Sequence, residues 1–397
     1  MEDQQQLTKS DDSELPPSNV EFGHALKRYY EFKENHMNLN HGSFGASPKF
    51  VTNARQEYIK DFESKPDFFL NFTHPKILEN RQIQLSQYVD ADPQDLVFVK
   101  NATEAATYIL KSLEYKPGDI ILMFDFVYGA VKSLCNHIAD QYQVELIIME
   151  TNLEVIKSKD NLIQIVQSHI TSYGQKIKIA IIDYISSTPA LCVPVKDIIL
   201  LFRENNILCM IDAAHTFNHI DFSIRKLDPD FYYSNIHKWA PMPKSLAFIY
   251  IKKEIRNRLF SIQDSQYRDF SNIYCLKETL EFIERLGRQR MMDYCKTLAH
   301  QAGQRISDIW GTELLIPTEN NQIAMINVVL PCQNKELLEK LFNPKFMLDK
   351  LQVYIVATKY KDFYYVRFSC YIYNQLSDYE FAANLVMKLL QSEGVKK

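Results

Sequence analysis

The sequence predicts an α/β fold, with a mainly parallel, seven-stranded sheet in a large domain and a smaller α+β domain after it. Short runs rich in β-branched residues alternate with segments of helical spacing, which is the pattern of parallel strands joined by crossover helices. Most of these runs are apolar along their length, as expected for strands that helices cover on both faces. The alternation stops near residue 285. We therefore expect a disordered tail over 1–20, a large domain over 21–285 and a small domain over 286–397.

Seven short runs are the expected strands of the large domain, and they span residues 96–99, 119–124, 144–150, 177–185, 207–212, 230–236 and 245–252. Segments with helical spacing follow the first three, at 101–113, 128–142 and 161–174. Parallel neighbours need such crossovers, because a tight turn joins only antiparallel strands. The runs therefore predict an open sheet that is buried between helices.

The chain before the first strand is expected to contain two helices and a turn-rich loop. Residues 24–35 have helical spacing. Residues 38–48, NLNHGSFGASP, are rich in turn formers, and Pro48 can begin the helix expected over 48–64. The stretch PDFFLNFTHP (66–75) is expected to be irregular.

The small domain is expected to contain one long helix, two strands and a final helix. In chain order these elements span 286–310, 324–331, 364–373 and 378–391. Strands that are not separated by regular crossover helices are typical of an α+β domain.

Composition and charge exclude several classes of function. The net charge of −4 argues against nucleic acid as a partner, and no apolar run is long enough to span a membrane. The first residues are polar and acidic and lack the parts of a signal peptide, so the cytoplasm is the expected location. The seven cysteines are scattered and form no C-x-x-C pair, which is typical of reduced thiols.

Motifs for metals and for nucleotide phosphates are missing. His215 and His219 stand four residues apart, but HTFNH lacks the glutamate of a zinc protease helix, so we expect no metal. The ten glycines form neither G-x-G-x-x-G nor a phosphate loop that ends in G-K-S/T.

Candidate site residues follow the predicted strands, because ligands of open α/β sheets bind outside the carboxyl ends of the strands. Ala102 and Thr103 follow the first strand at a helix start, where free N–H groups hold an anion. Tyr128 follows the second strand and could lie over a flat ring, and Ser186 follows the fourth. Each has a simpler alternative: an N-cap, a core aromatic residue and a turn, respectively.

The fifth and sixth strands end in a carboxylate and an amine. Asp212, with His215 nearby, either pairs with a pyridinium-like cation or caps the next helix. Lys238, beside His237, is either solvated or has a chemical task, because a lysine without a partner is costly to bury. Together the strand ends fit a flat, phosphorylated pyridine aldehyde. A lysine with a lowered pKa forms a Schiff base with such an aldehyde, and an aspartate keeps the ring nitrogen protonated.

The segments LNHGSFGASP, DAAH and NIHKWAP resemble the class V aminotransferase family of pyridoxal 5'-phosphate (PLP) enzymes, which have the aspartate-aminotransferase fold, also called fold type I. Within this family the chain is similar to the isopenicillin N epimerase-like branch, which includes the C–S lyases of ergothioneine synthesis. The likeness extends from about Asn38 to about Asn374. It implies a PLP cofactor, an amino acid substrate and a homodimer.

The resemblance implies a role for each matched residue. Lys238 would carry the Schiff base and later move the Cα proton, and Asp212 would pair with the pyridinium nitrogen. The other cofactor contacts would be Ala102, Thr103 and His237 at the phosphate, Tyr128 on the ring, and His215 with Ser186 near the phenolic oxygen. Arg367 matches the arginine that clamps the substrate carboxylate, although a solvated cation on a strand is the alternative. The substrate mouth would be lined by Asn40, His41 and Ser43.

Three departures from the family pattern bear on mechanism. The W-x-G-T-x-D segment that reaches the neighbouring subunit's phosphate is replaced by DSQYRD (264–269). The usual A-P-K-G becomes APMPKS, with Ser245 in the place of glycine. The loop before the arginine strand, QVYIVATKYKDFYY, has no cysteine, and Cys332 lies further upstream, so we do not expect a desulfurase that forms a persulfide.

The resemblance implies C–S β-elimination on a cysteine conjugate, with hercynylcysteine sulfoxide as the expected substrate. Three alternatives stay open at this point. An epimerase would place a second base on the opposite face of the substrate, and a transaminase would return a keto acid. A scaffold protein that has lost catalysis is the alternative from another class, because fold likeness alone does not specify function.

Overall fold

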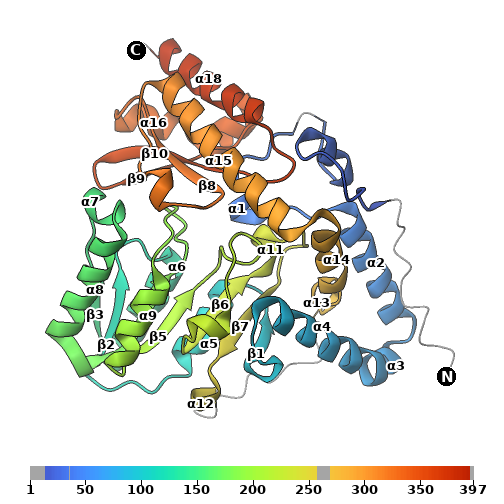
Figure 1. The fold of residues 1–397 in the computed structure, drawn as a ribbon, viewed down its shortest axis with the longest axis vertical. Coiled ribbons are helices and arrows are strands. Elements are labelled where there is room, and N and C mark those ends of the chain that lie inside the picture. The colour runs from blue at the N-terminus through green and yellow to red at the C-terminus, as the bar shows by residue number, and fades with distance from the viewer. Residues whose placement is uncertain (1–13, 35, 257–268, 394–397) are drawn as a thin grey trace.

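The computed structural model describes residues 14–34, 36–256 and 269–393, which form a large and a small domain (Figure 1). The large sheet has the strand order β1-β7-β6-β5-β4-β2-β3. Strands β2, β3, β4, β5 and β6 run parallel to one another, whereas β7 runs antiparallel to its neighbours β1 and β6. The predicted mainly parallel, seven-stranded sheet is therefore confirmed.

Each strand of this sheet lies inside the run that predicted it. The strands are β1 (Leu96–Val99), β2 (Ile120–Phe124), β3 (Glu145–Met149), β4 (Ile177–Asp183), β5 (Leu208–Asp212), β6 (Phe231–Asn235) and β7 (Ala247–Ile251). The agreement follows from the burial of both sheet faces, which makes these runs apolar at nearly every position.

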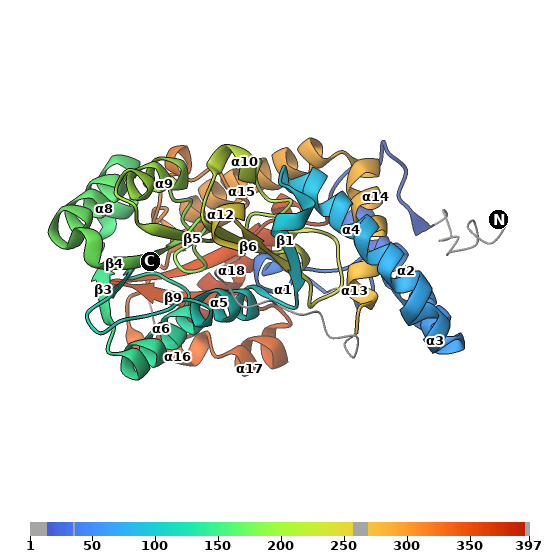
Figure 2. The same ribbon diagram turned by 90° about the horizontal axis from the view of Figure 1, so that it is seen from below.

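Helices cover the sheet on both faces, as Figure 2 shows. Helices α8 (Lys159–Tyr173) and α9 (Val195–Glu204) lie on one face, and α5 (Ala102–Lys111) and α6 (Gly129–Tyr142) lie on the other. Because side chains alternate along a strand, Ile120 of β2 joins the core beneath α8 and α9, and Ile121 joins the core beneath α5 and α6.

The N-terminal region is more helical than predicted in one place and less so in another. Its elements are η2 (His24–Tyr29), α1 (His41–Phe44), α2 (Lys49–Ser64), α3 (Pro66–Phe68), η3 (Phe69–Thr73) and α4 (His74–Val89). The helix expected over 24–35 stops at Tyr29, because Tyr30 pairs with Pro48 in an isolated bridge. Residues 66–75 are helical and not irregular: a π-helical turn connects α3 to α4, and Phe69 is buried there against Phe62.

The small domain combines a three-stranded antiparallel sheet with helices. The sheet order is β8-β10-β9, and its elements are β8 (Met325–Val329), α16 (Lys335–Leu341), α17 (Pro344–Phe346), η7 (Met347–Leu351), β9 (Val356–Tyr360), β10 (Phe363–Ser369) and α18 (Leu376–Ser392). Strand β9 was not predicted, because it is a half-buried edge strand with mixed polarity. The other two strands and the final helix were predicted.

Helices α13 (Ser271–Tyr274), α14 (Leu276–Leu286) and α15 (Arg288–Trp310) connect the two domains. Helix α14 packs on α2 and α4, whereas α15 packs on α18 and β8, so the packing partners of the chain change near Gly287. The short elements still to be named are η4 (Pro93–Asp95), α7 (Leu153–Ile156), η5 (Gly174–Lys176), α10 (Ile224–Leu227), α11 (Ile236–Trp239), α12 (Lys253–Arg256) and η6 (Thr318–Asn320).

The predicted N-terminal tail falls partly outside the described residues, which begin at Glu14. From there the chain packs on the fold: Leu15 is buried, and the carbonyl of Pro16 accepts a hydrogen bond from Arg285. Residues 14–20 are therefore part of the fold and not of a disordered tail. Within the described chain, every helix is too short or too polar to cross a bilayer.

Candidate active site

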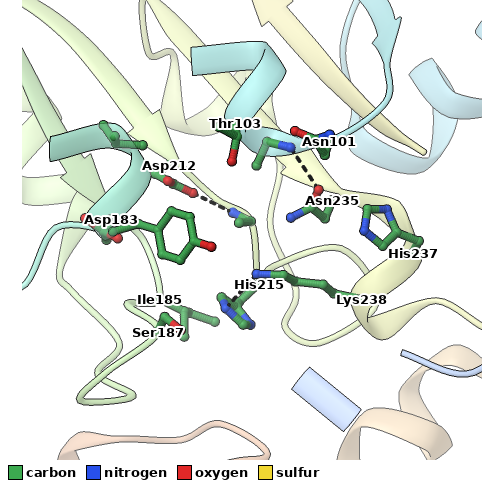
Figure 3. Close-up of a pocket in the computed structure, with 14 residues that line it drawn as sticks. Asn101, Thr103, Asp183, Ile185, Ser187, Asp212, His215, Asn235, His237 and Lys238 are labelled. Carbon is green, nitrogen blue, oxygen red and sulfur yellow. Dashed lines mark hydrogen bonds between the residues drawn. The ribbon is translucent and has the colours of Figure 1, made fainter. Parts of the chain in front are cut away.

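A cavity of about 170 Å³ lies where β4, β5 and β6 end and α5 begins (Figure 3). Its lining comes from five segments that are far apart in the sequence: Asn101, Ala102 and Thr103; Tyr128 and Val131; Asp183, Ile185 and Ser187; Asp212, Ala214 and His215; and Asn235, His237 and Lys238. The structure therefore brings together Ala102, Thr103, Tyr128, Asp212, His215, His237 and Lys238, all predicted as cofactor contacts.

Two carboxyl groups lie side by side in the cavity wall. Asp183 ends β4 and Asp212 ends β5, and the two residues are paired across the parallel strands. Asp212 accepts hydrogen bonds from the Ala214 N–H at 3.0 Å and from the Tyr233 hydroxyl at 2.9 Å. Burial raises the pKa of both carboxyl groups, and the Asp212 charge raises the pKa of Asp183 further. Such a pair favours a cation at this end of the cavity.

Lys238 projects from the one-turn helix α11, which follows β6 directly. Its Nζ lies 3.0 Å from Nε2 of His215. Burial lowers the pKa of Lys238 to about 8, and it holds the pKa of the His215 imidazole well below the usual range. An amine with this pKa is a nucleophile near neutral pH, which is the property that covalent catalysis by lysine requires.

The start of α5 forms the opposite end of the cavity. Asn101 caps the helix by accepting a hydrogen bond from the Glu104 N–H at 2.8 Å, and the Ala102 N–H donates to Oδ1 of Asn235 at 2.9 Å. Thr103 lines the cavity beside these groups. Nδ1 of His237 lies 2.7 Å from the Leu246 carbonyl oxygen and 3.1 Å from the Leu246 N–H, and these contacts hold the ring in place. A helix start with a hydroxyl and an imidazole suits a phosphate.

Arg367 extends from β10 of the small domain and is 2 % exposed. One guanidinium nitrogen, Nη1, donates to Ser187, and the other, Nη2, donates to Oδ1 of Asn40 at 2.8 Å and to Oγ of Ser43 at 2.6 Å. Its Nε has no hydrogen-bond partner, and no carboxylate of the described residues forms an ion pair with it. Burial lowers its pKa to about 10. A buried cation without an anion favours the binding of one.

Five predicted site residues are not among those that line the cavity, namely Ser186, Asn40, His41, Ser43 and Arg367. The Ser186 hydroxyl donates to the Pro189 carbonyl at 2.6 Å, and it is the next residue, Ser187, that lines the cavity. The sequence could not show which serine faces inward, because neighbouring side chains of an extended segment point opposite ways. His41 is fully buried behind the site, where its ring stacks on Tyr371 and its Nδ1 lies 2.7 Å from the Tyr373 hydroxyl.

Among the polar residues that line the cavity, sequence analysis missed Asn101, Asp183, Ser187 and Asn235. Asp183 and Asn235 each end a buried strand, as Asp212 does, and a polar residue at that position was the available signal. In the case of Ser187, the adjacent Ser186 was predicted instead.

The residues present fit the predicted cofactor. A flat pyridine ring that carries a phosphate and an aldehyde needs a carboxylate at its nitrogen, an anion site at its phosphate and an amine at its aldehyde. Asp212, the start of α5 and Lys238 supply these three groups. Asp183, which also lines the cavity, has no hydrogen-bond partner at its Oδ2 atom. The lining also includes Tyr128, whose side chain is 46 % exposed and is not part of the core.

Comparisons with known proteins agree with this geometry. The family described as Aminotransferase class-V matches residues 45–380. The chain is 24 % identical to hercynylcysteine sulfoxide lyase of Schizosaccharomyces pombe over 92 % of this chain and 97 % of that protein. It is 26 % identical to L-cysteine desulfhydrase of Arabidopsis thaliana, over 89 % of this chain and 88 % of that protein. Among solved structures, C-DES with glycine covalently linked to its PLP cofactor has a TM-score of 0.77 at 14 % identity, and the match covers 91 % of this chain and 98 % of that one.

Proposed function

The chain belongs to the class V aminotransferase family, and from this premise we propose that it is a C–S β-lyase that cleaves a cysteine conjugate. It is a PLP-dependent enzyme with the fold of that family. The observation that carries the proposal is that the site contains both Lys238, an amine with a lowered pKa, and Arg367, a buried guanidinium that has no anion beside it. An amino acid offers a carboxylate to Arg367 and a reactive Cα–H in the direction of Lys238.

We assign the cofactor contacts as follows. Lys238 would attach the aldehyde carbon, Asp212 would hold the ring nitrogen, and Tyr128 would cover the ring. The start of α5, with Thr103 and His237, would bind the phosphate. When bound, PLP accepts electrons from the substrate Cα, which makes the Cα–H bond acidic.

The residues of the chain then perform the elimination. Arg367 would fix the substrate carboxylate, and Asn40 and Ser43 would hold the guanidinium in place. The substrate amine would displace Lys238 from the aldehyde carbon, and the freed Lys238 would take the Cα proton as a base. The electron pair of the Cα–H bond would form a Cα–Cβ double bond while the Cβ–S bond breaks. The sulfur leaves with the electrons of the Cβ–S bond, and hydrolysis of the remaining fragment yields pyruvate and ammonia.

Three observations support a lyase over an enzyme that stores sulfur on a cysteine. The cavity lining, as described, includes no cysteine. Cys370 follows β10 but is fully buried, and burial raises its pKa, which disfavours the reactive thiolate. The two relatives named above are a sulfoxide lyase and a desulfhydrase, and both names describe C–S cleavage.

A groove beside the site favours a large sulfur substituent. It has a volume of about 450 Å³, and its wall includes Asn40, which also bonds Arg367. Its other lining residues include the aromatic side chains Phe32, Phe44 and Tyr354, and Lys244. The hercynyl group combines a quaternary ammonium, which binds aromatic faces, with a carboxylate, which suits a lysine. We therefore propose hercynylcysteine sulfoxide as a better substrate than L-cysteine.

The test is to offer the cofactor-loaded enzyme hercynylcysteine sulfoxide, an S-alkylcysteine sulfoxide and L-cysteine. A lyase releases pyruvate and ammonia in equal amounts, which coupled dehydrogenase assays measure. Deuterium uptake at Cα without any fragment would instead establish an epimerase, and a keto acid that keeps its side chain would establish a transaminase. If none of these three outcomes occurs, the chain is a scaffold protein without catalysis and the proposal is refuted.

The chain is also proposed to act as a homodimer in the cytoplasm. Phe68 and Phe72 are 59 % and 60 % exposed with their ring centroids 5.3 Å apart, and a second copy would cover this apolar surface. The segment that replaces the family's cross-subunit phosphate motif, 264–269, lies outside the described residues except for Asp269. All seven cysteines fall within the described residues and are unpaired, which supports a reducing compartment. Light scattering on the wild type and on Phe72→Asp tests the dimer.

A further inference from the structure

Trp239 follows Lys238 directly and makes a polar contact inside the site. Its side chain is 1 % exposed, and its indole Nε1 donates a hydrogen bond to Nδ1 of His215 at 3.2 Å. An indole N–H can only donate, so the direction of this bond is certain. Nδ1 of His215 is therefore an acceptor, and the neutral imidazole carries its proton on Nε2.

The Nε2–H of His215 faces Lys238, since these two nitrogens are 3.0 Å apart (Figure 3). An N–H can donate only to a group with a free lone pair, which a neutral amine has and an ammonium lacks. With Lys238 protonated, both nitrogens would direct a hydrogen into the same contact. The His215 tautomer therefore admits the amine form of Lys238 and disfavours the ammonium form.

The position of the indole is itself determined by a second histidine. The Trp239 ring stacks on His219, with centroids 3.7 Å apart and an interplanar angle of 18°. Nδ1 of His219 donates to the His215 carbonyl oxygen at 2.7 Å, and its Nε2 accepts a hydrogen bond from the Ala324 N–H at 2.8 Å. Ala324 immediately precedes β8, so the small domain contributes to the orientation of the indole.

We propose that Trp239 is a positioning residue that fixes the tautomer of His215 and thereby keeps Lys238 in its neutral, nucleophilic form. This inference rests on the proposed function of Lys238 as the amine that attaches the cofactor. It goes beyond that function because it names a residue that touches neither cofactor nor substrate.

Several charged groups also act on Lys238, and their effects are opposed. Asp212 on β5 and Asp183 on β4 favour the ammonium form, whereas Arg367 on β10 disfavours it, and His237 is its neighbour on α11. Burial outweighs the carboxylates and leaves the pKa of Lys238 at about 8. The Trp239 hydrogen bond acts in the same direction as burial, and it is the contribution that one substitution can remove without changing any charge.

The test is Trp239→Phe, which removes the donor and keeps an aromatic ring on His219. His215 can then move its proton to Nδ1 and accept a hydrogen bond from the ammonium. We expect the midpoint of covalent PLP attachment to move up by roughly one pH unit, so that attachment at neutral pH slows about tenfold. The rate is measured from about pH 6 to about pH 11, which brackets the lowered lysine pKa of about 8 and the ordinary value of 10.5. Borohydride trapping and peptide mass spectrometry quantify attachment at position 238.

Trp310→Phe is the matched control. Trp310 is 3 % exposed and also donates its indole N–H, but to the Ala383 carbonyl oxygen in the small domain. We expect the wild-type midpoint in this variant. An unchanged midpoint in Trp239→Phe, or an equal shift in both variants, would overturn the proposal.

A second measurement needs no tryptophan variant. In cofactor-free protein labelled with ¹⁵N-histidine, His215 should show a protonated Nε2 and an unprotonated Nδ1, with the signals assigned through His215→Gln. The reverse pattern would refute the inference even if Trp239→Phe failed to fold. Should the wild type attach no PLP at Lys238, the proposed function fails, while the tautomer is still read from these spectra.

Discussion

The substitution Arg367→Ala gives the sharpest test of the proposed substrate site. Arg367 is 2 % exposed, and its bonds to Ser187, Asn40 and Ser43 hold the guanidinium without neutralising it. A substrate carboxylate would supply the missing anion. Truncating one partner of a buried, hydrogen-bonded charge pair costs about 2–5 kcal/mol. That cost corresponds to a loss in kcat/KM of about 30-fold to a few thousand-fold.

The assay uses two substrates, a cysteine conjugate with a free carboxylate and the same conjugate with that carboxylate converted to an amide. The first releases pyruvate, the second releases the amide of pyruvate, and the two rates are compared. The loss should be large for the acid and small for the amide, because the amide has no charge to pair. Arg305→Ala is the control, since Arg305 is half exposed on the small domain and pairs with Glu380. A loss below about tenfold for the acid, or an equal loss for both substrates, would refute the assigned role of Arg367.

Three further predictions follow from the geometry. Lys238→Ala should abolish borohydride-fixed PLP, whereas Lys244→Ala, which removes an exposed lysine six residues further along the chain, should keep it. Peptide mass spectrometry locates the label, and a label at another lysine would reassign the amine. Ser245→Gly should raise the free energy of unfolding by about 0.5–1 kcal/mol in urea titrations, because Ser245 has a φ of +77° that glycine adopts without strain; a decrease would contradict this. Lys361→Ala should lower it by about 0.5–1 kcal/mol, because Lys361 Nζ pairs with Asp125 at 2.6 Å and Glu150 at 3.0 Å between the domains. That loss should vanish at about 1 M salt, and a salt-independent loss would argue against an ionic origin.

The sequence was sufficient for the large sheet and for the charged ends of its strands. Strands buried on both faces leave apolar runs, so the seven strands could be located within a few residues. Asp212, which ends β5, and Lys238, which follows β6, were selected as candidate site residues because polar residues at the ends of such runs lie at the edge where ligands bind. The edge strand β9 left no comparable pattern, because its side chains are only partly buried and mix polarities.

Only the tertiary structure decided which side chains meet. Ser187 and not Ser186 faces the cavity, His41 lies behind it, and Trp239 bonds to His215, which is 24 residues away in the chain. The hydrophobic periodicity of a segment shows which of its own residues are buried. It does not show which other segments those residues contact. Hydrogen bonds between segments depend on side-chain directions and on distances of a few tenths of an ångström, and those are set when β4, β5, α11 and the small domain pack together.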